Sequence, residues 1–396
     1  MSDMKEKKII AVLLVVCSFV FCIRNATYEL VAQIAGFLRQ DGTEQGDFAD
    51  FNAIEQNYAS SVWKHSDFLN FNGTAARLLG MRGLYSGMGM YAADGNYVVS
   101  ASPQTSTDYE VEQMKIFADF LEENGIHLLY VNQPTKYLED DFFAEQFGVE
   151  TYSNRNADLF MQRISDADIA AIDLRDAIVR DGLNIKDMFY RTDHHWTTNS
   201  ALWATREIAQ AMNDHCGYSI DTGIYNAENF EYTTYQNAWL GEQGRKMAKT
   251  YVGLDDFVEI KPNFDTRYTF KTENGTVDGT FDTFINESMY DTDADVYEAP
   301  SWHYSYAQIS SVNHNAPYGK VLLLGDSYAQ ATEPFLSLSV HELDWLILRD
   351  CSDDFDLHQY ILENGYDTVL ICYAQFMIGA HDDPSSANYK MFTFNG

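Results

Sequence analysis

The chain of 396 residues is long enough to bury a large hydrophobic core, so one large domain with an appendage is the default expectation. Its formal net charge of −33 argues against binding of nucleic acids or anionic polysaccharides through bulk electrostatics. With 46% hydrophobic and 14% aromatic residues, the chain is not an acidic disordered protein either.

The first 24 residues have the pattern of a membrane-targeting segment. Lys5, Lys7 and Lys8 precede a charge-free run of fifteen residues, 9–23, which Arg24 ends. A basic start followed by an apolar run is typical of a signal segment, and no small-x-small cleavage site is evident near its end. We expect an uncleaved signal-anchor over 1–24, with the N-terminus inside and the rest of the chain outside the cell. Secretion after cleavage is the alternative.

Residues 25–80 predict a helical stalk or cap, because Tyr28–Leu38 and Phe51–Leu69 have a loose helical period. A catalytic domain over 81–396 is expected to follow. The pattern there predicts, in order, a β-hairpin (Gly83–Val99), a helix (Tyr109–Asn124) ended by Gly125, a buried strand (Ile126–Val131), a helix (Asn156–Ile164) and a short strand (Ala170–Leu174). The first buried strand delivers Pro134-Thr135-Lys136 at its carboxyl end, where open α/β sheets bind ligands.

Asp193-His194-His195-Trp196 stands in a loop ahead of a predicted helix, Thr198–Asn213. An aspartate two residues before a histidine can accept a hydrogen bond from the imidazole Nδ1–H, which leaves Nε2 free to take a proton from a serine. Two histidines beside an aspartate also suit a metal site or a polar loop. Zinc, however, wants three or four ligands at recognisable spacing, and no such further partner is evident. We therefore predict neither a metal nor a cofactor.

Residues 217–315 change character, because Tyr, Thr, Asp and Gly alternate there without a helical period. We interpret them as an antiparallel β insertion with strands near Tyr232–Tyr235, Val258–Ile260, Tyr268–Thr272 and Thr280–Asn286. The carboxylates of Asp291–Asp295 lack the spacing of an EF-hand and indicate a solvated acidic turn. Trp239–Gly244 and Trp302–Tyr304 are candidates for lining a substrate groove, although surface or core packing explains each of them more simply.

Lys320–Gly325 is an apolar run that stops at Gly325-Asp326-Ser327 and then turns helix-friendly over Ala329–Ser339. Such a run predicts a buried parallel strand, a tight turn and a helix. Ser327 would then lie at the carboxyl end of a strand and near a helix N-terminus, where backbone N–H groups favour developing negative charge. Gly-Asp-Ser is also ordinary turn chemistry, so the interpretation of Ser327 as a nucleophile needs a base.

The C-terminal pattern completes an α/β rhythm with two strands and a helix, Asp344–Leu348, Asp356–Asn364 (ended by Gly365) and Thr368–Tyr373. Alternating strands and helices imply a parallel sheet with right-handed crossovers. The strand ends would then place Lys136, Ser327, Arg349 and Tyr373–Gln375 along one edge, with the Asp193/His195 loop folded over it.

Taken in this order, the motifs resemble those of the DHHW proteins, relatives of the alginate O-acetyltransferase family in the wider SGNH-hydrolase-like group. The resemblance runs from about Gly83 to the C-terminus. It depends on Asp193-x-His195-Trp196, on the later Gly325-Asp326-Ser327, and on Pro134-Thr135-Lys136 after an earlier strand. Ordinary SGNH hydrolases carry the serine first and Asp-x-x-His last, whereas the alginate-type enzymes reverse that order and use Asp-x-His, as this chain does.

The resemblance implies a three-layer α/β/α fold with a parallel sheet and permuted motifs. By analogy Ser327 would be the nucleophile, His195 the base and Asp193 the residue that orients it. The further candidates for substrate binding or for the oxyanion hole are Lys136, His194, Trp196, Asp326, Tyr328, Arg349 and Gln375.

The implied activity is O-acetyl transfer onto a cell-surface or secreted polysaccharide, with the acetyl donor delivered by a separate multispanning membrane acyltransferase. A carbohydrate acetyl-esterase of the same fold is one alternative, because it differs only in letting water reach the acyl-enzyme. A non-catalytic envelope protein that binds polysaccharide or aids its assembly is the other.

Overall fold

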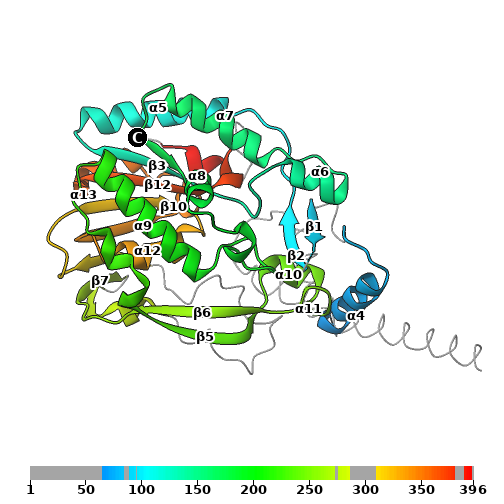
Figure 1. Cartoon of the computed structure of the whole chain (residues 1–396). Helices are drawn as coiled ribbons and strands as arrows, with labels where there is room; N and C mark the ends of the chain where they lie inside the picture. The colour runs from blue at the N-terminus through cyan, green and yellow to red at the C-terminus, as the bar shows by residue number, and fades with distance from the viewer. Residues whose placement is uncertain are drawn as a thin grey trace, which may run out of the picture. The chain divides into compact units, whose positions relative to one another are not determined.

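The computed structural model of the chain describes residues 65–83, 89–94, 96–272, 275–285, 309–379 and 388–394 (Figure 1). The expected signal-anchor, Tyr28–Leu38, Asp291–Asp295 and Trp302–Tyr304 lie outside these residues. Within the described ranges no helix is both long and apolar enough to cross a membrane. The chain divides into two compact units, 1–75 and 76–396, and α4 (His65–Leu78) holds the described residues of the first.

The centre of the second unit is a mostly parallel sheet, eight-stranded within the described residues. Its strands are, in spatial order, β4 (Ala171–Asp173), β3 (His127–Gln133), β12 (Thr368–Ala374), β10 (Lys320–Gly325), β11 (Glu342–Leu346), β9 (Ser311–Asn313), β7 (Tyr268–Thr272) and β8 (Gly275–Gly279). Neighbours from β4 to β11 are parallel, and neighbours from β11 to β8 are antiparallel. The predicted α/β class and parallel sheet are therefore confirmed.

Both faces of the sheet are covered by helices (Figure 1). Side chains of a strand alternate between the two faces, so Val321 and Leu323 enter one core while Leu322 and Leu324 enter the other. The first core also contains residues of α8 (Leu174–Arg180), α9 (Thr198–His215) and α12 (Ala329–Leu336), and the second those of α5 (Asp108–Glu123), α7 (Ser153–Ser165) and α13 (Leu357–Asn364).

Two helices end where the sequence predicts. Gly125 after α5 and Gly365 after α13 have φ angles of 69° and 66°, the left-handed conformation that glycine adopts without strain. The predicted strand Ala170–Leu174 is shorter, because the Asp173 side chain accepts the Arg175 N–H at 2.9 Å and starts α8 immediately. The short helix α6 (Asp141–Phe147) was not predicted.

The insertion is antiparallel but is not one unit. β5 (Phe230–Trp239) and β6 (Asp255–Pro262) form a two-stranded sheet of their own, whereas β7, β8 and β9 extend the central sheet. The predicted strand Thr280–Asn286 is wrong. Phe281–Phe284 is a 3-10 helix, whose two phenylalanines, three residues apart, both point into the core beside β7.

The predicted hairpin is confirmed as β1 (Met90–Ala93) paired with β2 (Tyr97–Ser100). It is joined to the Asp-His-His-Trp loop by the Val98 N–H, which donates to the Arg191 carbonyl at 2.8 Å. Two short helices, α10 (Glu242–Met247) and α11 (Lys249–Val252), lie in the chain between β5 and β6. Strand β10, the loop, the hairpin and α10 provide the residues of the candidate site.

Candidate active site

Ser327 lies at the carboxyl end of β10, in the turn that leads into α12. The fully buried Asp326 shapes this turn, because its Oδ1 accepts the Tyr328 N–H at 2.8 Å and its Oδ2 accepts the Ala374 N–H at 2.6 Å. Burial raises the pKa of Asp326 to about 6. Asp326 therefore braces the turn against β12 rather than facing a substrate, while the neighbouring Ser327 stays partly exposed.

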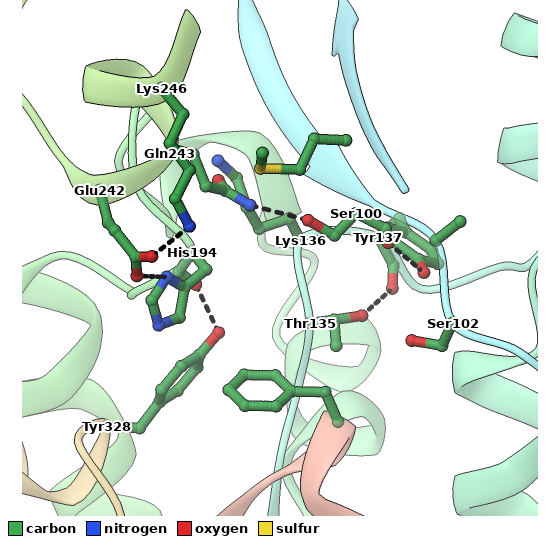
Figure 2. Close-up of a pocket in the computed structure, with 13 residues that line it drawn as sticks. Ser100, Ser102, Thr135, Lys136, Tyr137, His194, Glu242, Gln243, Lys246 and Tyr328 are labelled. Carbon is green, nitrogen blue, oxygen red and sulfur yellow. Dashed lines mark hydrogen bonds and ion pairs between the residues drawn. The ribbon is translucent and has the colours of Figure 1, made fainter. Parts of the chain in front are cut away.

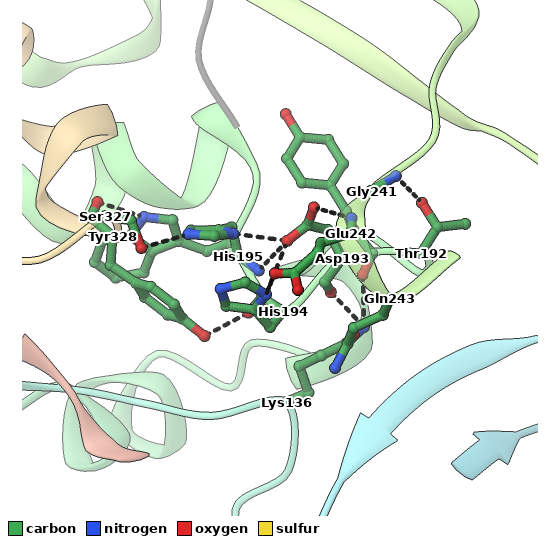
Figure 3. A network of polar contacts seen from close by, with 12 residues as sticks. Lys136, Thr192, Asp193, His194, His195, Gly241, Glu242, Gln243, Ser327 and Tyr328 are labelled. Atoms are coloured by element: carbon green, nitrogen blue, oxygen red, sulfur yellow. Dashed lines mark hydrogen bonds and ion pairs between the residues drawn. The ribbon is translucent and has the colours of Figure 1, made fainter. Parts of the chain in front are cut away.

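Ser327, His195 and Asp193 form one hydrogen-bonded chain (Figure 3). The Ser327 Oγ lies 2.7 Å from His195 Nε2, although 132 residues separate the two in sequence. On the other side of the ring, His195 Nδ1 lies 2.6 Å from Asp193 Oδ1. The same oxygen accepts the His195 backbone N–H at 3.0 Å, so the aspartate holds both the ring and the backbone of the histidine. Asp193 is fully buried and His195 nearly so.

The second oxygen of Asp193 is held by the turn that opens α10. Asp193 Oδ2 accepts the Glu242 N–H at 2.9 Å. A Cβ at Gly241 would lie only 2.3 Å from the Asp193 Cβ, so this approach requires glycine. The neighbouring Thr192 Oγ1 accepts the Gly241 N–H at 2.9 Å and donates to Asp255 Oδ2 at 2.7 Å. Three chain segments, the loop itself, the Gly241–Glu242 turn and β6, therefore fix the carboxylate behind His195.

Lys136 binds the backbone of the loop that carries Asp193. Its Nζ donates to the carbonyl oxygens of Tyr190, Arg191 and Asp193 at 2.7, 3.2 and 2.6 Å, and it lies 4.2 Å from the Tyr97 ring centroid. Burial lowers the pKa of Lys136 to about 7. Because the ammonium donates to three loop carbonyls, Lys136 positions Asp193 and is not directed at Ser327.

Replacing Lys136 with methionine leaves these three buried carbonyls without their donor, so the loop has to shift. We expect kcat for acetyl-ester hydrolysis to fall about 100-fold, the usual cost of displacing a catalytic group by about 1 Å. The KM for a small ester should change little. Steady-state kinetics and thermal melting of Lys136→Met, beside the exposed control Lys115→Met, measure both effects. An unchanged kcat would contradict the positioning role.

Three predicted residues surround the hydrogen-bonded chain. His194 is 25% exposed, and its Nδ1 lies 3.3 Å from Asp193 Oδ1. The Tyr328 hydroxyl donates to the His194 carbonyl, and the buried Trp196 donates its indole N–H to the Tyr328 carbonyl at 3.1 Å. These two hydrogen bonds connect the loop to the turn that carries Ser327. Trp196 is therefore a buried structural contact, whereas His194 and Tyr328 also line a pocket.

The other two predicted oxyanion donors have partners elsewhere. The buried Gln375 donates its amide N–H groups to Ser153 Oγ and Asn154 Oδ1, both at 3.0 Å. Arg349 Nε lies 3.6 Å from Asp350 Oδ1. Neither side chain makes a hydrogen bond to Ser327. Of the groups expected along this edge of the sheet, the Asp193/His195 loop does meet Ser327, whereas Gln375 and Arg349 are not hydrogen-bond donors to it.

Asp193, His194 and His195 also form a group whose potential metal-ligating atoms lie within 4.8 Å of one another. The same atoms already serve the hydrogen-bonded chain, since His195 Nδ1 and Asp193 Oδ1 face each other. A metal bound there would have to displace the proton that orients the ring.

Residues 90–290, half of the chain, match the family described as SGNH hydrolase-like domain, acetyltransferase AlgX. The chain belongs to this family. No curated protein matches it.

Several solved structures resemble this AlgX-family chain in fold, including one from Bacillus cereus and one from Eubacterium siraeum. That of Bacillus cereus PatB1 with a sulfonyl adduct has a TM-score of 0.61 and 22% identity, covering 78% of this chain and 98% of PatB1. That of a DHHW family protein from Eubacterium siraeum has a TM-score of 0.55 and 16% identity, covering 77% and 94% of the two chains. Together with the family match, they confirm the resemblance that the Asp-His-His-Trp and Gly-Asp-Ser motifs indicated.

A pocket of about 360 Å³ lies beside the three hydrogen-bonded residues Ser327, His195 and Asp193 (Figure 2). The lining comes from the hairpin and the residues just after it, the Lys136 loop, α10, the two motif turns and the segment after β12, namely Met90, Ser100, Ala101, Ser102, Thr135, Lys136, Tyr137, His194, Glu242, Gln243, Lys246, Tyr328 and Phe376. We call it the Gln243 pocket. His194 and Tyr328 adjoin His195 and Ser327 in sequence, so the pocket reaches the immediate surroundings of the serine.

Sequence reasoning did not predict the contacts that hold Asp193, and it missed seven of the thirteen residues that line the pocket. Trp239–Gly244 was a candidate groove, and Glu242 and Gln243 do line the pocket. Trp239 itself is buried and stacks on Tyr190 at 5.5 Å between ring centroids. Thr192, next to Asp193, is a sequence signal that could have been used, because a hydroxyl beside this aspartate is well placed to fix its loop.

Proposed function

We propose that this AlgX-family chain is a serine-dependent O-acetyltransferase in which Ser327 is the nucleophile, His195 the base and Asp193 the residue that orients the base. The observation that carries the proposal is the pair of short hydrogen bonds, 2.7 Å from Ser327 Oγ to His195 Nε2 and 2.6 Å from His195 Nδ1 to Asp193 Oδ1. This is the arrangement that activates a serine for acyl transfer.

In the first half-reaction His195 takes the proton from Ser327 Oγ, which attacks the carbonyl carbon of an acetyl ester. The tetrahedral oxyanion collapses, and the donor's alcohol leaves with the proton held by His195. In the second half-reaction His195 takes a proton from an acceptor hydroxyl, whose oxygen attacks the acetyl-Ser327 ester. Collapse of this intermediate releases the acetylated acceptor and returns the proton to Ser327.

The backbone supplies one donor for the oxyanion. Among the described residues the Ser327 N–H has no hydrogen-bond acceptor, and the turn that holds it leads directly into the N-terminus of α12. Both features favour negative charge on the substrate oxygen. The Lys136, Arg349 and Gln375 side chains have the other partners described above, so we assign them no part in the oxyanion hole.

We further propose that the enzyme acts outside the cytoplasm on a cell-surface or secreted polysaccharide. Support comes from the basic and then apolar pattern of residues 1–24, which suits a single-pass signal-anchor or a cleaved signal peptide. A multispanning membrane acyltransferase is the proposed source of acetyl groups, since nothing in an extracytoplasmic serine enzyme brings activated acetyl across a membrane.

An acetyl-esterase is the second candidate, favoured by the partial exposure of Ser327, which lets water approach the acetyl-enzyme. The two activities differ in which hydroxyl attacks in the second half-reaction. Product analysis therefore separates them.

The deciding experiment incubates the purified full-length protein with a chromogenic acetyl ester, with and without a neutral oligosaccharide acceptor. We expect acetylated oligosaccharide, and mass spectrometry of a rapidly quenched digest should find acetyl on the peptide that contains Ser327. Acetate alone with the same acetyl-peptide would support the esterase. A folded protein that forms neither product nor acetyl-peptide would reject both and favour an envelope binding protein.

A further inference from the structure

Most of the exposed surface of the Gln243 pocket is apolar, although eight of its thirteen lining residues have polar or charged side chains, and such a mixture suits a small polar ring. Tyr328 and Phe376, whose ring centroids are 5.8 Å apart, form one wall of the pocket. Tyr137 and Met90 form part of the remaining apolar surface. Aromatic and thioether surfaces of this kind suit the C–H face of a sugar ring.

Gln243 contributes a hydrogen-bond acceptor that the protein itself leaves unused. Its side chain is 95% buried, and its Nε2 donates to Ser100 Oγ at 2.9 Å, bridging α10 and the hairpin (Figure 2). Its Oε1 is buried and has no hydrogen-bond partner among the described residues. A buried amide oxygen without a donor is costly, so a ligand hydroxyl that donates to it would gain a full hydrogen bond.

The two lysines that line the pocket already have partners within the protein. Lys246 pairs with Glu242 one helical turn away, and Lys136 donates to three loop carbonyls. Glu242 Oε2 also lies 3.9 Å from His194 Nδ1. A carboxylate brought into the pocket would lose its hydration beside Glu242 and would have to compete with Glu242 for Lys246, and the net charge of −33 repels it at longer range.

We propose that the Gln243 pocket is the acceptor subsite and selects an uncharged, hydroxyl-bearing sugar ring over a uronic acid, with Gln243 Oε1 accepting a hydrogen bond from one of the ring hydroxyls. This inference deepens the proposed acetyltransferase function and rests on it. The ring lies against Tyr328 and Phe376, which presents a neighbouring hydroxyl to the acetyl group on Ser327. Gln243 is thus a specificity-determining residue, and it takes no part in the chemistry of the serine.

The test compares wild type, Gln243→Leu and the exposed control Gln359→Leu, whose amide donates to Glu363 within α13. Acetyl transfer to a neutral oligosaccharide and to a uronic-acid oligosaccharide is measured for each protein, with hydrolysis of the same ester without sugar as the reference. We expect the KM for the neutral acceptor to rise about tenfold in Gln243→Leu, well beyond any change in hydrolysis, and to stay the same in Gln359→Leu.

Calorimetric titration of the Ser327→Ala protein with each oligosaccharide separates the subsite from the chemistry. If the neutral sugar binds Ser327→Ala but binds Ser327→Ala/Gln243→Leu more weakly, the subsite is supported. Absence of transferase activity in wild type would then contradict only the proposed function. Equal binding of the neutral sugar with and without Gln243, or tighter binding of the uronate, overturns the subsite while leaving the serine chemistry intact.

Discussion

Replacing Ser327 with alanine is expected to lower the rate of acetyl-ester turnover by about 10⁶-fold, the effect of removing a serine nucleophile from an intact triad. The acetyl-peptide should disappear at the same time, because the remaining groups have no atom to acylate. The fold should be kept, since the turn is braced by Asp326 through Tyr328 and Ala374 and not by the serine hydroxyl. Single-turnover kinetics and melting curves measure the two effects.

Ser352→Ala is the matched control, because it makes the same change at an exposed position away from β10. It should leave turnover unchanged. If Ser327→Ala retained even a tenth of the wild-type rate with its fold intact, the covalent mechanism would be wrong, and a direct attack by water or sugar would have to replace it.

The sequence predicts that Ser327, His195 and Asp193 meet, because each belongs to a short local pattern. Lys320–Gly325 is apolar on both faces, which makes β10 a central parallel strand and places Ser327 at its carboxyl end. The two-residue offset between Asp193 and His195 lets one carboxylate oxygen reach both the ring and the backbone N–H of the histidine. Parallel strands bring their carboxyl ends to one edge, so groups 132 residues apart meet there.

The support of the site could not be predicted, because it depends on contacts without a local pattern. The Gly241–Glu242 turn reaches Asp193 only because β5 and β6 form a separate sheet with α10 between them in the chain. Gln243 meets Ser100 across 143 residues, and nothing near either residue marks the pair. Lys136 was expected at the edge of the sheet as a substrate or oxyanion group, but its long side chain turns to the loop carbonyls.

Asp193→Asn provides the sharpest test of the orienting role, because both oxygens of Asp193 act only as acceptors in the described contacts. Oδ1 accepts from the His195 ring and backbone, and Oδ2 accepts from the Glu242 N–H. An asparagine has one oxygen and one NH₂ group, so one of these sides must lose its acceptor. If the NH₂ group faces His195, the ring has to present a bare Nδ1 and carry its proton on Nε2, where it cannot take the proton of Ser327.

We therefore expect Asp193→Asn to lower kcat/KM about 10⁴-fold while keeping the fold, with the exposed Asp265→Asn as a control of unchanged activity. If the NH₂ group turns to Glu242 instead, its contact with the Glu242 N–H destabilises the protein, and the melting temperature falls while the histidine keeps its tautomer. Proton NMR of the His195 ring distinguishes the two orientations through the nitrogen that carries the hydrogen. A variant with the Nδ1–H tautomer, the wild-type melting temperature and full activity would show that the carboxylate of Asp193 is not needed to orient the base.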